Sequence, residues 1–349
     1  MIRPVLNQVR WDMIKLRRRW MPWVFLGVVV LVSQLRLLSE YEMYNNIDIG
    51  RIEVQTAPPD EEGKTPTIGI SCLDIRDGAV ESKLSMVQSE YRQTASKEIE
   101  SLRERCTATL AMYDLARNNF LDNAMLPNSL AFYGLSVFGS LGYIFVMVLA
   151  AMAMGVEYTW GTARQVLAKG CGRGEFLLVK ILSLMAVVGI GHMVVMLVMG
   201  ISSLVISYAL LDTGIETDVI QWLRAGTDVI KSMYAMLPYV VLGIFFALLT
   251  SSASSGIVIS MVFFLCETIL RGVLHAYVGP DATRILISVN IPLWMASLDF
   301  PTLNDPSAIY SYMRNFLSTF LPILAYIVVF GCASLWLFHR RDLRPSTGG

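Results

Sequence analysis

The sequence predicts an α-helical polytopic membrane protein with six transmembrane helices, an N-terminal interfacial helix and a small α+β domain between the first two spans. Of the 349 residues, 54% are hydrophobic and only 16% are charged. Soluble domains carry roughly 25% charged residues, so this composition indicates a membrane protein. The apolar residues also gather in long runs, and about 20 of them in a helix cross the hydrocarbon core of a bilayer.

Six apolar runs are long enough to be spans. They are residues 21–38, 130–154, 181–211, 234–251, 256–278 and 316–338. The third run is longer than one bilayer requires, so we expect this helix to tilt, protrude or bend at one of its glycines.

The charges that flank these runs predict the orientation. Residues 1–20 carry six basic residues and a single acid, Asp12, and the tail 339–349 carries three arginines and one aspartate. Basic flanks concentrate on the cytoplasmic side, so we expect a multi-pass protein of the cell membrane with both termini in the cytoplasm. Residues 155–180 then lie inside and residues 39–129 lie outside.

Residues 1–20 also have helical periodicity. An apolar set recurs near one face, and the arginines lie largely elsewhere; the set is Val5, Val9, Met13, Leu16 and Trp20. This pattern predicts a basic amphipathic helix in the membrane interface. The alternative is a polar lead-in to the first span.

Residues 39–129 are too many for a simple connection between spans. Two strand-like segments, 48–56 and 67–75, precede a helical stretch at 79–121. The predicted buried ridge of that helix is Ala95, Ile99, Leu102, Cys106, Leu110, Tyr113 and Arg117. Cys72 and Cys106 share this region, and outside the cytosol they either form a disulfide or remain free thiols. The domain can serve contacts with substrate, a partner or a second copy.

Residues 279–315, before the last span, are unusually apolar for an exposed loop. The segments 285–289, 291–295 and 300–301 suggest short helices that dip into the outer leaflet. Backbone at that depth is tolerated only where it packs against protein or lines a wet cavity.

No catalytic or metal-binding pattern is evident. Gly63-Lys64-Thr65 resembles the end of a phosphate-binding loop, but that pattern requires a glycine where Pro58 stands. The three histidines lie far apart, and no G-x-S-x-G elbow occurs. We therefore expect neither an enzyme nor a bound cofactor in this chain.

The fifth span carries ionisable residues at helical spacing. Glu267, Arg271 and His275 recur every four residues on one face. Charges at membrane depth are costly and often face a cavity, so one interpretation is a translocation path or gate. The other is an intrahelical Glu267–Arg271 pair near the outer interface.

A charged segment separates the second and third apolar runs. Its pattern Glu-Tyr-x-x-Gly-Thr-x-Arg-x-x-Leu-x-x-Gly, followed by Arg and Lys, resembles the cytoplasmic loop of ABC-2 type permeases, the membrane subunits of ATP-binding-cassette (ABC) exporters. The matching positions are Glu157, Gly161, Thr162, Arg164, Leu167, Gly170, Arg173 and Lys180. The six spans, the N-terminal helix and the re-entrant segment resemble the ABC-2 (type V exporter-like) architecture as well.

The resemblance implies a function. In that family the loop is a coupling helix that docks on a dimer of ATPase subunits, which bind ATP and Mg. This chain, with a second copy or a related permease, would form a path that exports a hydrophobic or amphipathic cargo such as a lipid, drug or peptide, with no role for nucleic acid. Glu157, Gly161 and Arg164 are expected on one face of a helix that begins at the membrane surface, where Gly161 permits close approach to the partner. Arg173 and Lys180 would lie at the lipid phosphate level.

The predicted outer domain departs from this family, many of whose members have only a short loop after the first span. The alternative function is therefore a multi-span receptor or assembly protein whose outer domain binds a partner. One span would suffice for that role, so the six apolar runs favour the transporter.

Overall fold

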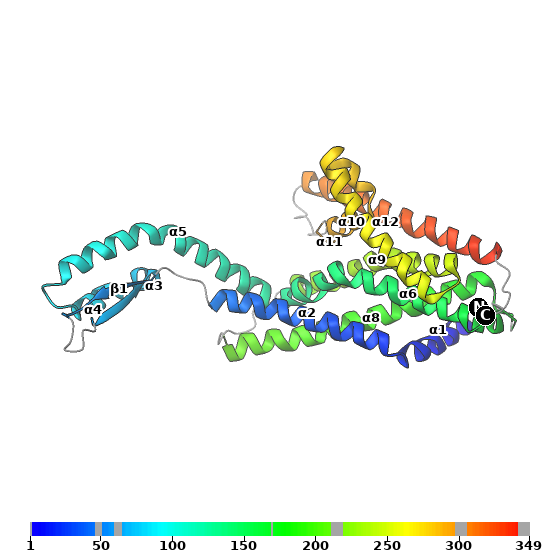
Figure 1. The fold of residues 1–349 in the computed structure, drawn as a ribbon, viewed down its shortest axis with the longest axis horizontal. Coiled ribbons are helices and arrows are strands. Elements are labelled where there is room, and N and C mark those ends of the chain that lie inside the picture. Colours follow the sequence, from blue (N-terminus) through cyan, green and yellow to red (C-terminus); the bar gives the residue numbers. More distant parts are fainter. Residues whose placement is uncertain are drawn as a thin grey trace. The chain divides into compact units, whose positions relative to one another are not determined.

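The computed structural model describes residues 2–45, 51–58, 65–168, 170–210, 219–296 and 306–340. The chain divides into two compact units (Figure 1). We call Met1–Leu35 together with Met125–Gly349 the helical unit, and Arg36–Ala124 the α+β unit.

The helical unit is built mainly from long helices. In chain order it contains α1 (Ile2–Arg17), α2 (Trp20–Asn45, whose residues from Arg36 belong to the α+β unit), the π-helical turns η1 (Leu130–Leu135) and η2 (Phe138–Gly142), α6 (Tyr143–Thr159), α7 (Thr162–Ala168), α8 (Arg173–Val205), the π-helical turn η3 (Ile206–Leu210), α9 (Val219–Thr250), α10 (Ala253–Tyr277), the 3-10 helix η4 (Pro280–Ile285), α11 (Ile287–Ala296) and α12 (Pro306–Arg340).

The helices confirm the prediction of a polytopic α-helical membrane protein. Within the described residues, five helices are long and apolar enough to cross a membrane, namely α2, α8, α9, α10 and α12. The bent pair α6 and α7 brings the number to six if it counts as one span. Each predicted apolar run thus overlaps one of these helices, although the second run begins in π-helical turns and its helix continues to Thr159.

Helix α9 lies at the centre of the helical unit. In its most apolar stretch 67% of the residues are buried, against 11% in α10 and in α12. Two glycines in this unit allow the backbones of neighbouring helices to approach each other closely. A Cβ on Gly243 of α9 would lie 2.3 Å from the carbonyl oxygen of Met147 in α6, and one on Gly155 would lie 2.3 Å from Cα of Ala253 in α10. Glycine is required where helices approach this closely.

Two predicted loops contain more helix than expected. In the segment 155–180, α6 continues to Thr159, α7 spans Thr162–Ala168 and α8 already begins at Arg173, so most of the segment is helical. The apolar segment 279–315 contains η4 and α11, and α12 begins at Pro306; the expected short helix at 300–301 lies outside the described residues.

The α+β unit has its own core. Strands β1 (Arg51–Gln55) and β2 (Thr67–Ser71) pair antiparallel, with Ile52 opposite Ile70. Helices α3 (Cys72–Arg76), α4 (Val80–Ser85) and α5 (Arg92–Ala124) follow. The helical stretch expected at 79–121 is divided by a turn into α4 and α5, and α5 continues to Ala124. Its predicted ridge is confirmed where it meets the strands: Ala95, Ile99, Leu102 and Cys106 are buried.

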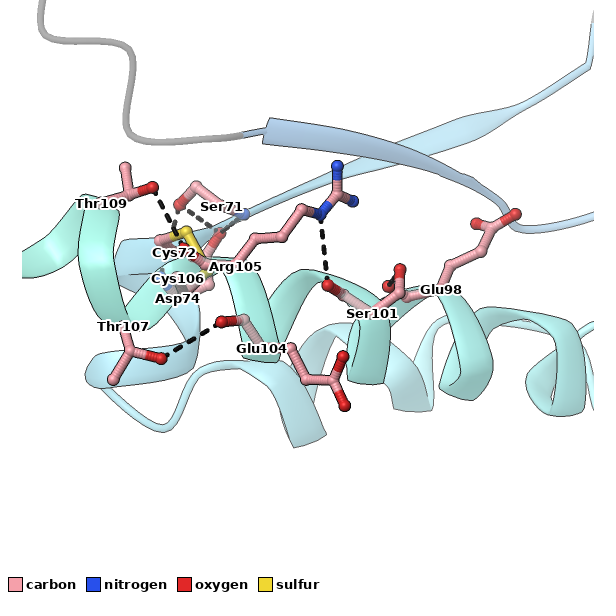
Figure 2. The surroundings of a disulfide bond; sticks show 10 residues. All are labelled: Ser71, Cys72, Asp74, Glu98, Ser101, Glu104, Arg105, Cys106, Thr107 and Thr109. Atoms are coloured by element: carbon pink, nitrogen blue, oxygen red, sulfur yellow. Dashed lines mark hydrogen bonds between the residues drawn. A yellow bond between two sulfur atoms is a disulfide. The ribbon is translucent and has the colours of Figure 1, made fainter.

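A disulfide between Cys72 and Cys106 joins the start of α3 to α5 (Figure 2). Beside it, the Ser71 hydroxyl accepts a hydrogen bond from the backbone N–H of Asp74, and the Asp74 carboxylate accepts one from the backbone N–H of Ser71. This capping box satisfies N–H groups that the short helix α3 leaves open. Since 34 residues separate the two cysteines, the chain-entropy estimate gives the disulfide roughly 3–4 kcal/mol of stabilisation.

Candidate functional site at the bend between α6 and α7

The segment that carries the charged motif folds as a sharp bend. The axes of α6 and α7 differ by 73° across the break at Trp160 and Gly161. The backbone N–H of Trp160 still donates to the carbonyl of Val156, and Gly161 then takes a φ of +67°. A left-handed residue that ends a helix is usually glycine, since a Cβ is strained there.

The bend corrects the expected geometry of the motif. Glu157 lies in α6, Gly161 in the turn and Arg164 in α7, so the three residues do not share one helical face. The expectation assumed an unbroken helix, and the left-handed glycine breaks it. No atom lies within 4 Å of a Cβ built on Gly161, so the glycine serves the backbone turn rather than a close contact.

A buried ion cluster lies directly behind the bend. The ammonium nitrogen of Lys180 lies 2.5 Å from Oδ1 of Asp12 and 3.0 Å from Oε1 of Glu157. The three side chains are only 4%, 8% and 5% exposed, respectively. Lys15, which is half exposed, lies 3.5 Å from the same Glu157 oxygen. Buried charges are stable only when paired, so this cluster fastens α1, α6 and α8 together.

The cluster extends into α7 through Thr162. The Thr162 hydroxyl donates a hydrogen bond to Oε2 of Glu157, across the bend. Both oxygens of Glu157 are thereby engaged, one by a lysine ammonium and one by the first residue of α7. Oδ2 of Asp12 is buried and has no hydrogen-bond partner among the described residues. The position of α7 is therefore tied to the packing of α1 against α8.

Arg173 makes a separate connection at the start of α8. Its Nη1 donates to the backbone carbonyls of Phe338 and His339, each at 2.6 Å, in the last turn of α12. Cations are favoured at the C-terminal end of a helix, where carbonyl groups lack partners. The expectation that Lys180 reaches the lipid phosphate level is corrected, because its ammonium is buried in the ion cluster. Arg173 binds the end of α12, and its level in the membrane stays a prediction.

The outer side of the bend is open. Arg164 on α7 and Trp160 in the turn are exposed, and the guanidinium carbon of Arg19 lies 5.9 Å from the centre of the Trp160 ring. A large aromatic ring and an arginine on an exposed surface are typical of the anchors of protein interfaces. One side of the bend is therefore held by the buried ion cluster, and the other side exposes Trp160 and Arg164 to solvent.

The polar face predicted on α10 is divided by the fold. Glu267 is buried, and its Oε1 accepts a hydrogen bond of 2.8 Å from the backbone N–H of Ser288 in the first turn of α11. Arg271 and His275 are exposed. None of the ion pairs within the described ranges joins Glu267 to Arg271. Glu267 caps α11, and a role of this face in a path or gate stays a prediction.

Two residues of the ion cluster were missed in the sequence. In the sequence, Asp12 and Lys15 indicate only the charge balance of the N-terminal segment. A signal for Asp12 was available, because it is the one acid in residues 1–20 and lies four residues before Leu16, on the predicted apolar face. Its partner Lys180 could not be identified, since 168 residues separate them. The described residues contain no group of three His, Cys, Asp or Glu side chains that could hold a metal ion.

The fold and this site define a polytopic helical membrane protein in which α6 and α7 meet at a sharp bend. The short helix α7 is held by buried contacts on one side and carries the exposed Arg164 on the other. The chain belongs to the DUF2705 family, whose description is "protein of unknown function"; the family pattern matches residues 106–344, about two thirds of the chain. No curated protein matches the sequence.

Proposed function

We propose that this chain is the membrane-spanning subunit of an ABC exporter and that α7 is the helix that docks on a separate ATPase subunit. The observation that carries the proposal is the 73° bend, with Glu157 fastened behind it and Arg164 exposed in front of it. A docking helix has to present a surface to a soluble partner and also pass movement to the spans.

The contacts behind the bend suggest how movement would be transmitted. A displacement of α7 would reach Glu157 through Thr162, then Lys180 of α8 and Asp12 of α1. Arg173 would carry the same displacement to the end of α12. ATP binding, with Mg, would close two ATPase subunits, draw two coupling helices together and switch the access of the path between the two sides.

The complete exporter would contain two permease chains, either two copies of this one or this chain and a relative. The proposed cargo is hydrophobic or amphipathic, such as a lipid, drug or peptide, in keeping with the apolar spans. The proposed orientation has both termini in the cytoplasm and the α+β unit outside. The disulfide between Cys72 and Cys106 supports an oxidising surrounding for that unit.

A second candidate function is a receptor or assembly protein. The α+β unit favours it, because a separate core and a disulfide make a stable surface for binding a partner. In that case the spans would anchor the protein, and α7 would bind no ATPase.

Purification from native membranes in mild detergent, followed by mass spectrometry of associated proteins, distinguishes the two functions. The exporter predicts an ABC ATPase in stoichiometric amount, which Arg164→Glu releases and Arg103→Glu, an exposed position in the α+β unit, retains. Reproducible absence of an ATPase from intact wild-type protein would favour the receptor. Once an ATPase is found, Gly161→Trp should uncouple ATP hydrolysis from transport. Gly161 has a φ of +67°, and a tryptophan with that φ would strain the turn that positions α7.

A further inference from the structure

A groove opens between α1, α2 and α8. Its volume is about 710 Å³, within the range of roughly 300–1,000 Å³ that is common for small-molecule sites. The apolar part of its lining includes Met13 of α1, Phe25 of α2, Phe138 of η2, and Val187 and Gly191 of α8. Such a lining suits a hydrocarbon chain.

Two arginines border this apolar space. Arg10 and Arg17 line the groove together with Met13 and Ile14. Positions 10, 13, 14 and 17 have the spacing of one helical face, so the two charges flank the apolar pair. Both arginines are exposed, and neither takes part in an ion pair within the described residues. An apolar groove with unpaired cations on its border is complementary to a molecule with an apolar chain and an anionic head.

The border is fixed by the turn between α1 and α2. The indole N–H of Trp23, which also lines the groove, donates a 2.8 Å hydrogen bond to the backbone carbonyl of Arg17. Asp12 of α1 is not among the residues that line the groove, and it pairs with Lys180 of α8. These two contacts fix the turn that carries Arg17 and hold α1 against α8.

We propose that this groove binds one anionic glycerophospholipid, with an acyl chain against Phe25, Phe138 and Val187 and the phosphate at Arg10 and Arg17. Guanidinium groups bind phosphate oxygens through paired hydrogen bonds, and basic pockets beside membrane helices attract anionic head groups. A lipid without net charge would gain the apolar contacts but would lose part of the attraction to the second arginine. This site requires no ATPase, so it stands or fails independently of the proposed export function.

Native mass spectrometry of the delipidated full-length protein, titrated with phosphatidylglycerol or phosphatidylcholine of the same acyl chains, tests the proposal. We expect one tightly bound phosphatidylglycerol with a preference of roughly tenfold or more, since each basic residue near an anionic head strengthens binding several-fold. Arg10→Gln with Arg17→Gln should abolish the preference. The matched variant Arg18→Gln, an exposed arginine that does not line the groove, should retain it.

A second pair of variants tests the apolar part. Gly191→Leu fills the groove, because its Cβ would already lie 3.7 Å from Phe138 and 3.9 Å from Leu26, and it should remove the tight lipid of either kind. Gly27→Leu has no atom within 4 Å of its Cβ and should bind as wild type. Equal affinity of the wild type for the two lipids would overturn the proposal. So would an equal loss of the preference for phosphatidylglycerol in the Arg18→Gln protein and in the Arg10→Gln/Arg17→Gln protein. Arg10→Lys with Arg17→Lys keeps both charges but loses the paired hydrogen bonds, so it should keep part of the preference, which would show that the double glutamine variant has not merely misfolded.

Discussion

Lys180 shows how one side chain can decide whether a segment is a surface loop or a structural joint. Its aliphatic stem and ammonium group are buried, and the charge is balanced by carboxylates from two other helices. In water each such pair would contribute little, but in a buried site the loss of one partner leaves an uncompensated charge. The three charges therefore act as a unit.

Lys180→Met should destabilise the detergent-solubilised protein strongly, by roughly 3–5 kcal/mol, because Asp12 and Glu157 would stay buried without their cation. Thermal unfolding monitored by intrinsic fluorescence measures the loss. The triple variant Asp12→Asn, Glu157→Gln and Lys180→Met should recover part of it, and Lys97→Met, an exposed lysine, should change little. Equal melting temperatures for Lys180→Met and Lys97→Met would show that the cluster does not bind the helices together.

Asp74 gives the α+β unit a defined dependence on pH. Burial raises the pKa of Asp74, but the hydrogen bonds from Lys83 and from Ser71 outweigh it and hold the pKa below its usual range. A carboxylate with a lowered folded pKa stabilises the fold above its unfolded pKa of 3.8, and this contribution is lost as the pH falls through the folded pKa.

Asp74→Asn should therefore weaken the hydrogen-exchange protection of β2 and α3 at pH 7, measured by mass spectrometry on the full-length protein. The wild type and the variant should converge in acid, below both pKa values, where the wild-type carboxyl is also neutral. A difference of the same size at pH 7 and in strong acid would mean that the charge of Asp74 is not the cause.

At the scale of elements, the contact between α6 and α9 depends on the absence of a side chain at Gly243. A Cβ there would lie 2.3 Å from the Met147 carbonyl oxygen and 2.8 Å from Cβ of Ala150. Gly243→Leu should therefore force the helices apart, at a cost of at least about 1–3 kcal/mol. Gly272→Leu is the matched control, because no atom lies within 4 Å of its Cβ. Comparable yields of monodisperse protein from both variants would contradict this packing.

The sequence predicted elements well where one local rule decides them. The ridge of α5 follows from helical spacing alone, and Ala95, Ile99 and Leu102 are buried as expected. The bend after α6 was not predicted, because a glycine within a charged helical pattern fits both a continuous helix and a left-handed turn. Only tertiary contacts, such as the pairing of Glu157 with Lys180, decide between those two conformations.

At the scale of the whole molecule, the distribution of basic residues predicts the orientation. Single cysteines introduced as Lys97→Cys and Arg164→Cys, in a chain whose free cysteines Cys171, Cys266 and Cys332 are replaced by serine, test it in intact cells. A membrane-impermeant maleimide should label position 97 before lysis and position 164 only afterwards. Labelling of position 164 in intact cells would place α7 outside and exclude an intracellular ATPase as its partner.

The assembly of the site illustrates what the sequence could not supply. Asp12, Glu157 and Lys180 come from three helices, and the separations of 168 and 23 residues follow no motif. Composition and the lengths of the apolar runs predicted a helical membrane protein, because the thickness and polarity of the bilayer set both quantities whichever helices pack together. The ion cluster depends on which helices pack together, which those quantities leave open.

We propose that α7 binds an ATPase, and photo-crosslinking from α7 is the decisive test of this contact. Arg164 is replaced by benzoylphenylalanine in the full-length protein, membranes are irradiated, and crosslinked peptides are identified by mass spectrometry. The same replacement at Arg103, an exposed position in the α+β unit, is the control. We expect position 164, and not position 103, to crosslink to a protein with a G-x-x-x-x-G-K-[ST] phosphate-binding loop. Repeated absence of such a crosslink at position 164, in protein that retains its normal melting temperature, would contradict the account.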